Sequence, residues 1–265
     1  MNLIRKLKRL FTRSPDPHEA NTIGMRYLLG EGLPKDYAKA FACLSYAANE
    51  GLASAQCNLG LCFEKGLGTA KDIRKALRLY RKSAEQGDAR AQYSMGYAYD
   101  KGEVVLEDKA EAFKWYLKSA EQGFVAAQLC VADAYDDGVG IAMDKKEAFK
   151  WFRKAAEQDN EAAQLMLGIM CENGEGIETD NNEAFKWYMK AAEHGVAAAQ
   201  WKVGCAYDNG VGTDRNIFKA RRWYEAALKN GYKDAKEGLS ALQNKTIEFV
   251  RDSALTPSFR KDPRE

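Results

Sequence analysis

Small and bulky apolar positions recur along this chain at a fixed interval of 36 residues. The pair Ala-Gln falls at 55–56, 91–92, 127–128, 163–164 and 199–200. Glycine keeps the same interval at Gly30, Gly66, Gly102, Gly138, Gly174 and Gly210. A single register held without insertion or deletion for about 200 residues indicates a repeat array.

The first half of each unit predicts a helix with one apolar face. In the unit 89–124, apolar side chains recur at helical spacing: Ala91, Met95, Ala98 and Tyr99. Gly96 lies inside this helix, where glycine costs about 1 kcal/mol relative to alanine. Close approach by a second helix, which a Cβ atom would block, explains a glycine there. Gly102 is expected to end the helix as a C-cap.

The second half of each unit predicts another helix that opens on a capping side chain. One repeat position holds Asp36, Asp72, Asp108, Asp144, Asp180 and Asn216. Such a cap is worth about 1 kcal/mol. Acids three residues later predict an Asp variant of the capping box, in the pairs Asp108/Glu111, Asp144/Glu147 and Asp180/Glu183. Glycine is expected to end this helix, as at Gly123, but Asp159 takes that place in the fourth unit. The left-handed geometry is costlier for Asp, so we expect this turn to be the weakest.

A single helix pair cannot bury both of its faces, so neighbouring pairs must stack. The fold class expected is all-α, a right-handed α-solenoid of six 36-residue antiparallel helix pairs with terminal capping helices. The expected boundaries are a basic amphipathic segment over 1–16, six repeats over 17–232, a C-terminal capping helix over 233–252 and a flexible tail over 253–265.

The repeat pattern Ala-x-Ala-Gln-x-x-x-Gly-x-x-Tyr-x-x-Gly-x-Gly, followed by a cap Asp and Ala-Phe-Lys-Trp-Tyr, resembles the Sel1-like repeat. That family is a tetratricopeptide-like α-solenoid, and the resemblance covers residues 17–252. The departures are Val104, Ala132 and Cys171, which replace a loop Gly, the helix Gly and the Tyr. The resemblance implies a non-catalytic scaffold or adaptor that organises other proteins, without naming one. Members of the family occur in bacterial signalling, envelope and host-interaction systems and in eukaryotic degradation complexes, so the resemblance implies a setting of one of these kinds.

Charge is nearly balanced over the whole chain, with a formal net charge of +2, which disfavours a nucleic-acid partner. The balance is uneven, since residues 1–13 carry +5 and the rest sums to −3. Arg5, Lys6, Lys8 and Arg9 flank an apolar helical face in this segment. Three interpretations stay open: a cap or partner-docking helix, a helix on an anionic membrane surface, or a disordered start.

The cysteines and histidines do not predict a disulfide framework, a metal site or a catalytic centre. The six cysteines fall at unrelated repeat positions, as expected of reduced thiols in the cytoplasm. There is no CxxC motif and no Cys/His spacing that suggests zinc. The two histidines, His18 and His194, have no nucleophile or acid arranged around them. We therefore expect no cofactor, no metal and no catalytic residue. No run approaches the roughly 18 apolar residues that a membrane span requires.

Two positions of the first helix are candidate binding positions by analogy with tetratricopeptide arrays. Counting from residues 53, 89, 125, 161 and 197, position 5 holds Cys57, Tyr93, Leu129, Leu165 and Trp201. Position 9 holds Leu61, Tyr97, Asp133, Ile169 and Cys205. Facing the concave groove, these residues would form an apolar stripe with Trp201 as an anchor. The alternative is that they are buried between units.

Position 12 is acidic in five units: Glu64, Asp100, Asp136, Glu172 and Asp208. Acids near a helix C-terminus oppose the helix dipole, so each is expected to have a compensating partner. That partner is either a neighbouring group of the protein or a basic or amphipathic helical peptide in the groove.

The function favoured by the sequence is a cytoplasmic scaffold that binds a protein or peptide in the concave groove. The alternative is a regulator at a membrane surface, in peripheral contact through the basic N-terminal helix. A hydrolase is disfavoured because no residues offer a nucleophile with its base. The sequence leaves the oligomeric state open.

Overall fold

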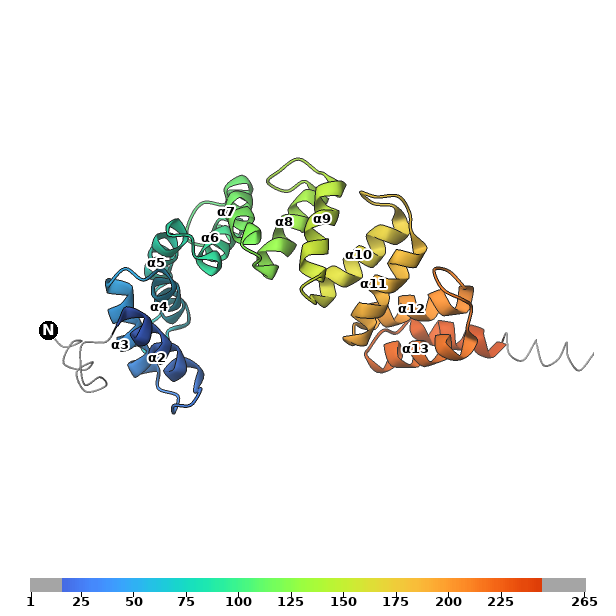
Figure 1. Ribbon diagram of the computed structural model, residues 1–265, viewed down its shortest axis with the longest axis horizontal. Helices are drawn as coiled ribbons and strands as arrows, with labels where there is room; N and C mark the ends of the chain where they lie inside the picture. Colours follow the sequence, from blue (N-terminus) through green and yellow to red (C-terminus); the bar gives the residue numbers. More distant parts are fainter. Residues whose placement is uncertain (1–15, 245–265) are drawn as a thin grey trace, which may run out of the picture. The chain divides into compact units, whose positions relative to one another are not determined.

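The computed structural model describes residues 16–244, which consist of helices and short connections without a strand (Figure 1). The helices are α2 (Pro17–Leu29), α3 (Tyr37–Asn49), α4 (Ala53–Lys65), α5 (Ile73–Glu85), α6 (Ala89–Lys101), α7 (Lys109–Glu121), α8 (Val125–Asp137), α9 (Lys145–Ala156), α10 (Glu161–Asn173), α11 (Asn181–Glu193), α12 (Ala197–Asn209) and α13 (Ile217–Lys229). A further helical stretch covers residues 235–244. The all-α solenoid of six repeats predicted from the sequence is confirmed.

The chain divides into two compact units, Met1–Asp144 and Lys145–Glu265. The first unit contains α2 to α8 and the second contains α9 to α13 with residues 235–244. In each unit, every helix packs on the next helix in chain order. First and second helices of the repeats therefore alternate along each unit, as the 36-residue pattern requires.

The glycine inside the first helix lies against a tyrosine of the second helix. A Cβ atom built on Gly96 would lie 2.5 Å from Cδ1 of Tyr116, and one on Gly60 would lie 2.7 Å from Cε1 of Tyr80. No side chain fits at such distances unless the ring moves. The close approach predicted from the sequence is confirmed here.

The second helices begin at the predicted caps, but only half of the capping box forms. Oδ1 of Asp108 accepts a hydrogen bond from the backbone N–H of Glu111 at 2.9 Å. The reciprocal bond is absent, because the backbone N–H of Asp108 donates to the carbonyl of Tyr99 at 3.0 Å. The Glu111 carboxylate instead pairs with Lys114 at 3.0 Å. The prediction of a full capping box at Asp108/Glu111 is thus wrong, because the backbone N–H of Asp108, which Glu111 would have to bind, is already bonded to the preceding helix.

The same half-formed box occurs at Asp180 in the second unit. Oδ1 of Asp180 accepts from the backbone N–H of Glu183 at 3.0 Å. The backbone N–H of Asp180 donates to the carbonyl of Cys171 at 2.9 Å, and Glu183 pairs with Lys186 at 3.3 Å. The prediction of a full box is wrong here for the same reason.

The turn after α9 has the left-handed geometry predicted for it. Asp159 has φ +59° and is the one non-glycine residue with positive φ within 16–244. The equivalent residues Gly51, Gly87, Gly123, Gly195 and Gly231 all have positive φ. Asp159 therefore bears a backbone cost that glycine avoids at the other positions.

A buried glutamine near the start of the first helix connects three helices. Nε2 of Gln92 in α6 donates to the carbonyl of Ala84 in α5 at 3.2 Å. Oε1 of Gln92 accepts a hydrogen bond from Nε2 of Gln122, the C-cap residue of α7, at 2.7 Å. The Ala-Gln pair that marks the repeat in the sequence thus ties each repeat to the one before it.

The C-terminal helical stretch begins at residue 235, two residues later than predicted, because residues 233–234 form a turn. It packs on α13: Leu242 is buried, and a Cβ on Gly238 would lie 2.8 Å from Cζ of Tyr224. The predictions for the basic segment, for the end of the capping helix and for the tail fall on residues 1–15 and 245–265, outside the described part of the chain. No helix within residues 16–244 combines the length and apolar character needed to cross a membrane.

Candidate functional site

Three pockets in the structure are the same pocket at different repeats. Each lies between the end of one first helix, the second helix that follows it, and the next first helix. We call them repeat pockets and name each by its position-9 residue: the Tyr97 pocket (α4, α5, α6), the Asp133 pocket (α6, α7, α8) and the Cys205 pocket (α10, α11, α12). Their volumes are about 560, 220 and 170 Å³. The first two belong to the first unit and the third to the second unit.

Equivalent repeat positions line the three pockets. The Tyr97 pocket contains Glu64, Ala76, Leu77, Tyr80, Tyr97 and Lys101. The Asp133 pocket contains Asp100, Ala112, Phe113, Tyr116, Asp133 and Asp137. The Cys205 pocket contains Glu172, Ala184, Phe185, Tyr188, Cys205 and Asn209. The frame of acid, alanine and tyrosine is constant, whereas the side chain at position 9 changes its chemistry from pocket to pocket.

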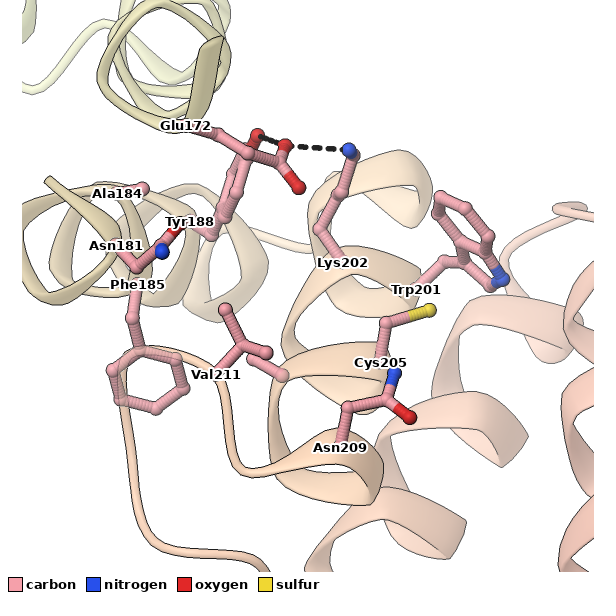
Figure 2. Close-up of a pocket in the computed structure, with 11 residues that line it drawn as sticks. Glu172, Asn181, Ala184, Phe185, Tyr188, Trp201, Lys202, Cys205, Asn209 and Val211 are labelled. Carbon is pink, nitrogen blue, oxygen red and sulfur yellow. Dashed lines mark hydrogen bonds and ion pairs between the residues drawn. The ribbon is translucent and has the colours of Figure 1, made fainter. Parts of the chain in front are cut away.

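The acid of the Cys205 pocket is held by two donors from neighbouring helices. The Tyr188 hydroxyl donates to Oε2 of Glu172 at 2.5 Å, and Nζ of Lys202 donates to the same oxygen at 2.6 Å, as Figure 2 shows. Burial acts to raise the pKa of Glu172, but the bonds from Lys202 and Tyr188 outweigh it and lower the pKa below its usual 4.5. The charge of Glu172 is therefore compensated within the protein.

The Tyr97 pocket follows the same scheme. The Tyr80 hydroxyl donates to Oε2 of Glu64 at 2.7 Å, and Lys65 pairs with Oε1 at 2.7 Å. In the first unit, Asp100 pairs with Lys101 at 2.9 Å and Lys109 at 3.1 Å. At these position-12 acids the compensating partner is a neighbouring group of the protein.

The Asp133 pocket differs from the others by an excess of acid. The carboxylates of Asp100, Asp133 and Asp137 line it together with a single cation, Lys109. Desolvation of the Asp133 carboxyl by the surrounding protein raises its pKa, and the negative charges of Asp137 and Asp136 raise that pKa further. A bound cation would relieve this repulsion, so this pocket favours a positively charged group.

Aromatic residues among the candidates reach the pockets to different extents. Tyr97 is 48% exposed in its pocket. Tyr93 is half-buried, with its ring 5.3 Å from that of Phe124. Trp201 is half-buried and stacks on Tyr232 at 5.3 Å, at the edge of the Cys205 pocket (Figure 2). Tyr93 and Trp201 at position 5 thus pack against an aromatic ring at the end of their own repeat, while Tyr97 at position 9 is open to a ligand.

Other sequence candidates do not line a repeat pocket. Cys57 is buried, with 6% of its surface exposed, and Asp208 is buried as well. The half-buried ones are Leu61, Leu129, Leu165, Ile169 and Asp136. The predicted stripe is therefore not uniformly apolar or open: it is divided into separate pockets. Arg5, Lys6, Lys8 and Arg9 lie outside the described residues.

The thiols offer little chemistry. All six cysteines are free, and burial raises the pKa of Cys43, Cys62 and Cys171 to about 11 and that of Cys57 to about 12. They are protonated at neutral pH and so are poor nucleophiles. Residues 16–244 contain no cluster of three His, Cys, Asp or Glu side chains that could hold a metal ion.

The family model of the Sel1 repeat matches six consecutive segments of the chain: 23–52, 53–88, 89–124, 125–160, 161–196 and 197–232. The chain belongs to the Sel1 repeat family. Sel1 repeat proteins are generally scaffolds for protein interactions.

Two solved Sel1 repeat structures resemble the chain over most of its length. One is c5321, a protective antigen of uropathogenic Escherichia coli strains with an SLR fold. It is 34% identical with a TM-score of 0.82, over 86% of this chain and 49% of that one. The present chain thus spans about half the length of that antigen. The other, a Sel1 repeat protein from Oxalobacter formigenes, is 32% identical with a TM-score of 0.72, over 84% of this chain and 87% of that one. No protein of curated function matches the chain.

Within this Sel1 array, the sequence analysis missed the residues that complete the pockets. These are the second-helix tyrosines, the lysine partners of the acids, and the loop valines Val139 and Val211. The tyrosines carry a signal, since Tyr80, Tyr116, Tyr188 and Tyr224 recur in steps of 36 residues or its multiples. Lys202 carries none, because other units hold different residues at its position.

Proposed function

We propose that this protein is a non-catalytic scaffold that binds a helical segment of a protein partner through its repeat pockets. The observation that carries the proposal is the recurrence of one pocket with a changing side chain at position 9. A frame repeated by the fold and varied at some of its lining positions, position 9 among them, is suited to reading successive side chains of an elongated ligand.

The two repeat pockets of the first unit favour different side chains of that ligand. The Tyr97 pocket offers the exposed ring of Tyr97 with Leu77 and Val104, a surface for an apolar side chain. The Asp133 pocket, with its excess of carboxylates, suits a lysine or arginine. The partner segment we propose is an amphipathic helix with an apolar and a basic residue on one face. We place this recognition in the cytoplasm, where free thiols persist.

The test is a comparison of matched variants. A partner captured from native cytoplasm is purified, and its affinity is measured for the wild type and for Tyr97→Ala and Asp133→Asn. The controls are Tyr37→Ala, an exposed tyrosine outside the repeat pockets, and Asp214→Asn, an exposed acid in the connection between α12 and α13. We expect each pocket variant to weaken binding by about ten-fold, or about 1.4 kcal/mol, and the controls to leave it unchanged.

Thermal melts of all four variants show whether the fold is intact. Folded pocket variants that bind the partner as tightly as the wild type would overturn the proposal. A partner that binds only a chain carrying residues 1–13 would favour the alternative function through the basic segment.

A further inference from the structure

Helix α5 carries three arginines on one exposed face. Arg74, Arg78 and Arg81 follow the spacing i, i+4, i+7, which spans about 10 Å along a helix. They surround a shallow pocket of about 340 Å³ whose other lining residues are Leu77 and Val104. The pocket therefore combines three guanidinium groups with an apolar floor.

No carboxylate pairs with these arginines within residues 16–244. Arg81 donates from Nη2 to the Tyr99 hydroxyl at 2.9 Å, a neutral partner. The nearby cap Asp72 is engaged by Lys75 at 3.1 Å and accepts the backbone N–H of that residue at 2.9 Å. The remaining charged side chains of α5 are Glu85 and Lys82, so the helix has a clear excess of positive charge.

Helix α9 shows how the same positions look when their charges are compensated. Its residues Lys146, Lys150 and Arg153 stand two repeats after Arg74, Arg78 and Arg81. There, Nζ of Lys150 pairs with Glu147 at 2.5 Å, and Nε of Arg153 pairs with Glu157 at 3.4 Å. In α5 the position of Glu147 is taken by Lys75, which removes the glutamate that would face the arginine one turn later. The uncompensated charge is thus a property of α5 and not of the repeat.

The chemistry of this pocket selects an acidic protein segment. Guanidinium groups bind carboxylates in a fixed, often bidentate geometry. Leu77 and Val104 offer contact to an apolar side chain between the charges. No aromatic ring of residues 16–244 lines the pocket, so this part of the chain supplies no stacking platform of the kind on which single-stranded nucleic acids are bound.

We propose that Arg74, Arg78 and Arg81 form a docking site for an acidic segment of a protein partner that places one apolar side chain over Leu77 and Val104. The site differs from the repeat pockets in the ligand that it binds: it binds carboxylates, whereas the Asp133 pocket favours a cation. Leu77 and Val104 also border the Tyr97 pocket, so the two sites adjoin at these two residues.

The test uses a fluorescent glutamate-rich peptide with a single central leucine as probe, and binding is followed by fluorescence anisotropy. The triple variant R74Q/R78Q/R81Q is compared with the matched control K146Q/K150Q/R153Q, which removes the same charge from the same repeat positions. We expect the α5 variant to lose at least about ten-fold in affinity and the α9 control to stay within about two-fold of the wild type. The variant R74K/R78K/R81K, which keeps the charge, is expected to fall between the wild type and the glutamine variant.

Three further arms locate the contact and measure its specificity. Replacing the leucine of the peptide by glutamine is expected to weaken binding, and a photoreactive group at that place is expected to cross-link near Leu77 or Val104. Tyr97→Ala is expected to leave peptide binding unchanged, which separates this site from the proposed function. Equal losses in the α5 and α9 variants, the absence of binding by the wild type, cross-links elsewhere, or tighter binding of an oligonucleotide of equal charge would each overturn the proposal.

Discussion

Gln164 is fully buried and its Oε1 has no hydrogen-bond donor among residues 16–244, while His194, at the repeat position that supplies this donor elsewhere, is exposed. In the equivalent pairs, Nε2 of Gln86 donates to Oε1 of Gln56 at 2.8 Å, and Nδ2 of Asn230 donates to Oε1 of Gln200 at 2.9 Å. A buried acceptor left without a partner is costly. The substitution of an amide by His194 therefore leaves one connection between the helices of the fifth repeat unmade.

Restoring the amide is expected to stabilise the protein. We predict that His194→Gln raises the free energy of unfolding by about 1 kcal/mol, because the new Nε2 can donate to Oε1 of Gln164. Urea denaturation followed by circular dichroism measures the change. His194→Ala, which supplies no donor, is the control; an equal gain in both variants would contradict the role assigned to the amide.

Filling the space beside the helix glycine is expected to destabilise the protein. In Gly96→Ala the new Cβ would meet the ring of Tyr116, and overpacking of this kind costs about 1 to 3 kcal/mol. The better helix propensity of alanine offsets about 1 kcal/mol of this cost. A lower melting temperature for Gly96→Ala than for Ser94→Ala, a half-buried neighbour in the same helix, would agree with the prediction. A variant more stable than the wild type would contradict it.

Relieving the left-handed residue after α9 is expected to stabilise the protein. Asp159→Gly should raise the free energy of unfolding by about 1 kcal/mol, since glycine adopts positive φ without the Cβ clash. Gln158→Gly, one residue earlier, is the control and should not stabilise. Chemical denaturation compares the two, and a loss of stability in Asp159→Gly would show that the aspartate side chain contributes more than its backbone costs.

The pairing of Glu172 predicts a pH dependence of stability. Its pKa is lowered in the folded protein, so its contribution is present above the unfolded value, near 4.5, and is lost as pH falls through the folded pKa. We expect Glu172→Gln to be less stable than the wild type at neutral pH. The difference should shrink as the pH is taken below 4.5. Urea denaturation over a pH series measures it, and a difference that does not change with pH would mean that the carboxylate charge is not involved.

The features that the sequence predicted correctly are set by the 36-residue periodicity or by hydrogen bonding within one turn of a helix. Gly96 and the cap at Asp108 are such cases, because periodicity and local hydrogen bonding determine both. The capping box at Glu111 was predicted wrongly because the backbone N–H that it requires is bonded to Tyr99 of the preceding helix. A local pattern does not reveal a competitor from another helix.

The candidate site was predictable only in part for a similar reason. Position 9 was predicted to face a groove, and Tyr97 at that position lines a pocket. The division of the expected stripe into pockets was not predicted, because it depends on how far Tyr188 and Lys202 reach toward Glu172 from two other helices. The arginine face of α5 was not predicted as a site either. Its charge is uncompensated because Lys75 stands where α9 has a glutamate, and this difference is visible only when the two helices are compared.

Because Gln92 of α6 bonds to Ala84 in α5 and to Gln122 at the C-cap of α7, the local opening of α6 removes a partner from both of its neighbours. Amide protons of α5, α6 and α7 should therefore exchange with deuterium at similar, slow rates, as one cooperative block. In α10 and α11, where Gln164 lacks this second bond, exchange should be faster and less coupled. A single unsatisfied side chain would then set where the array first opens.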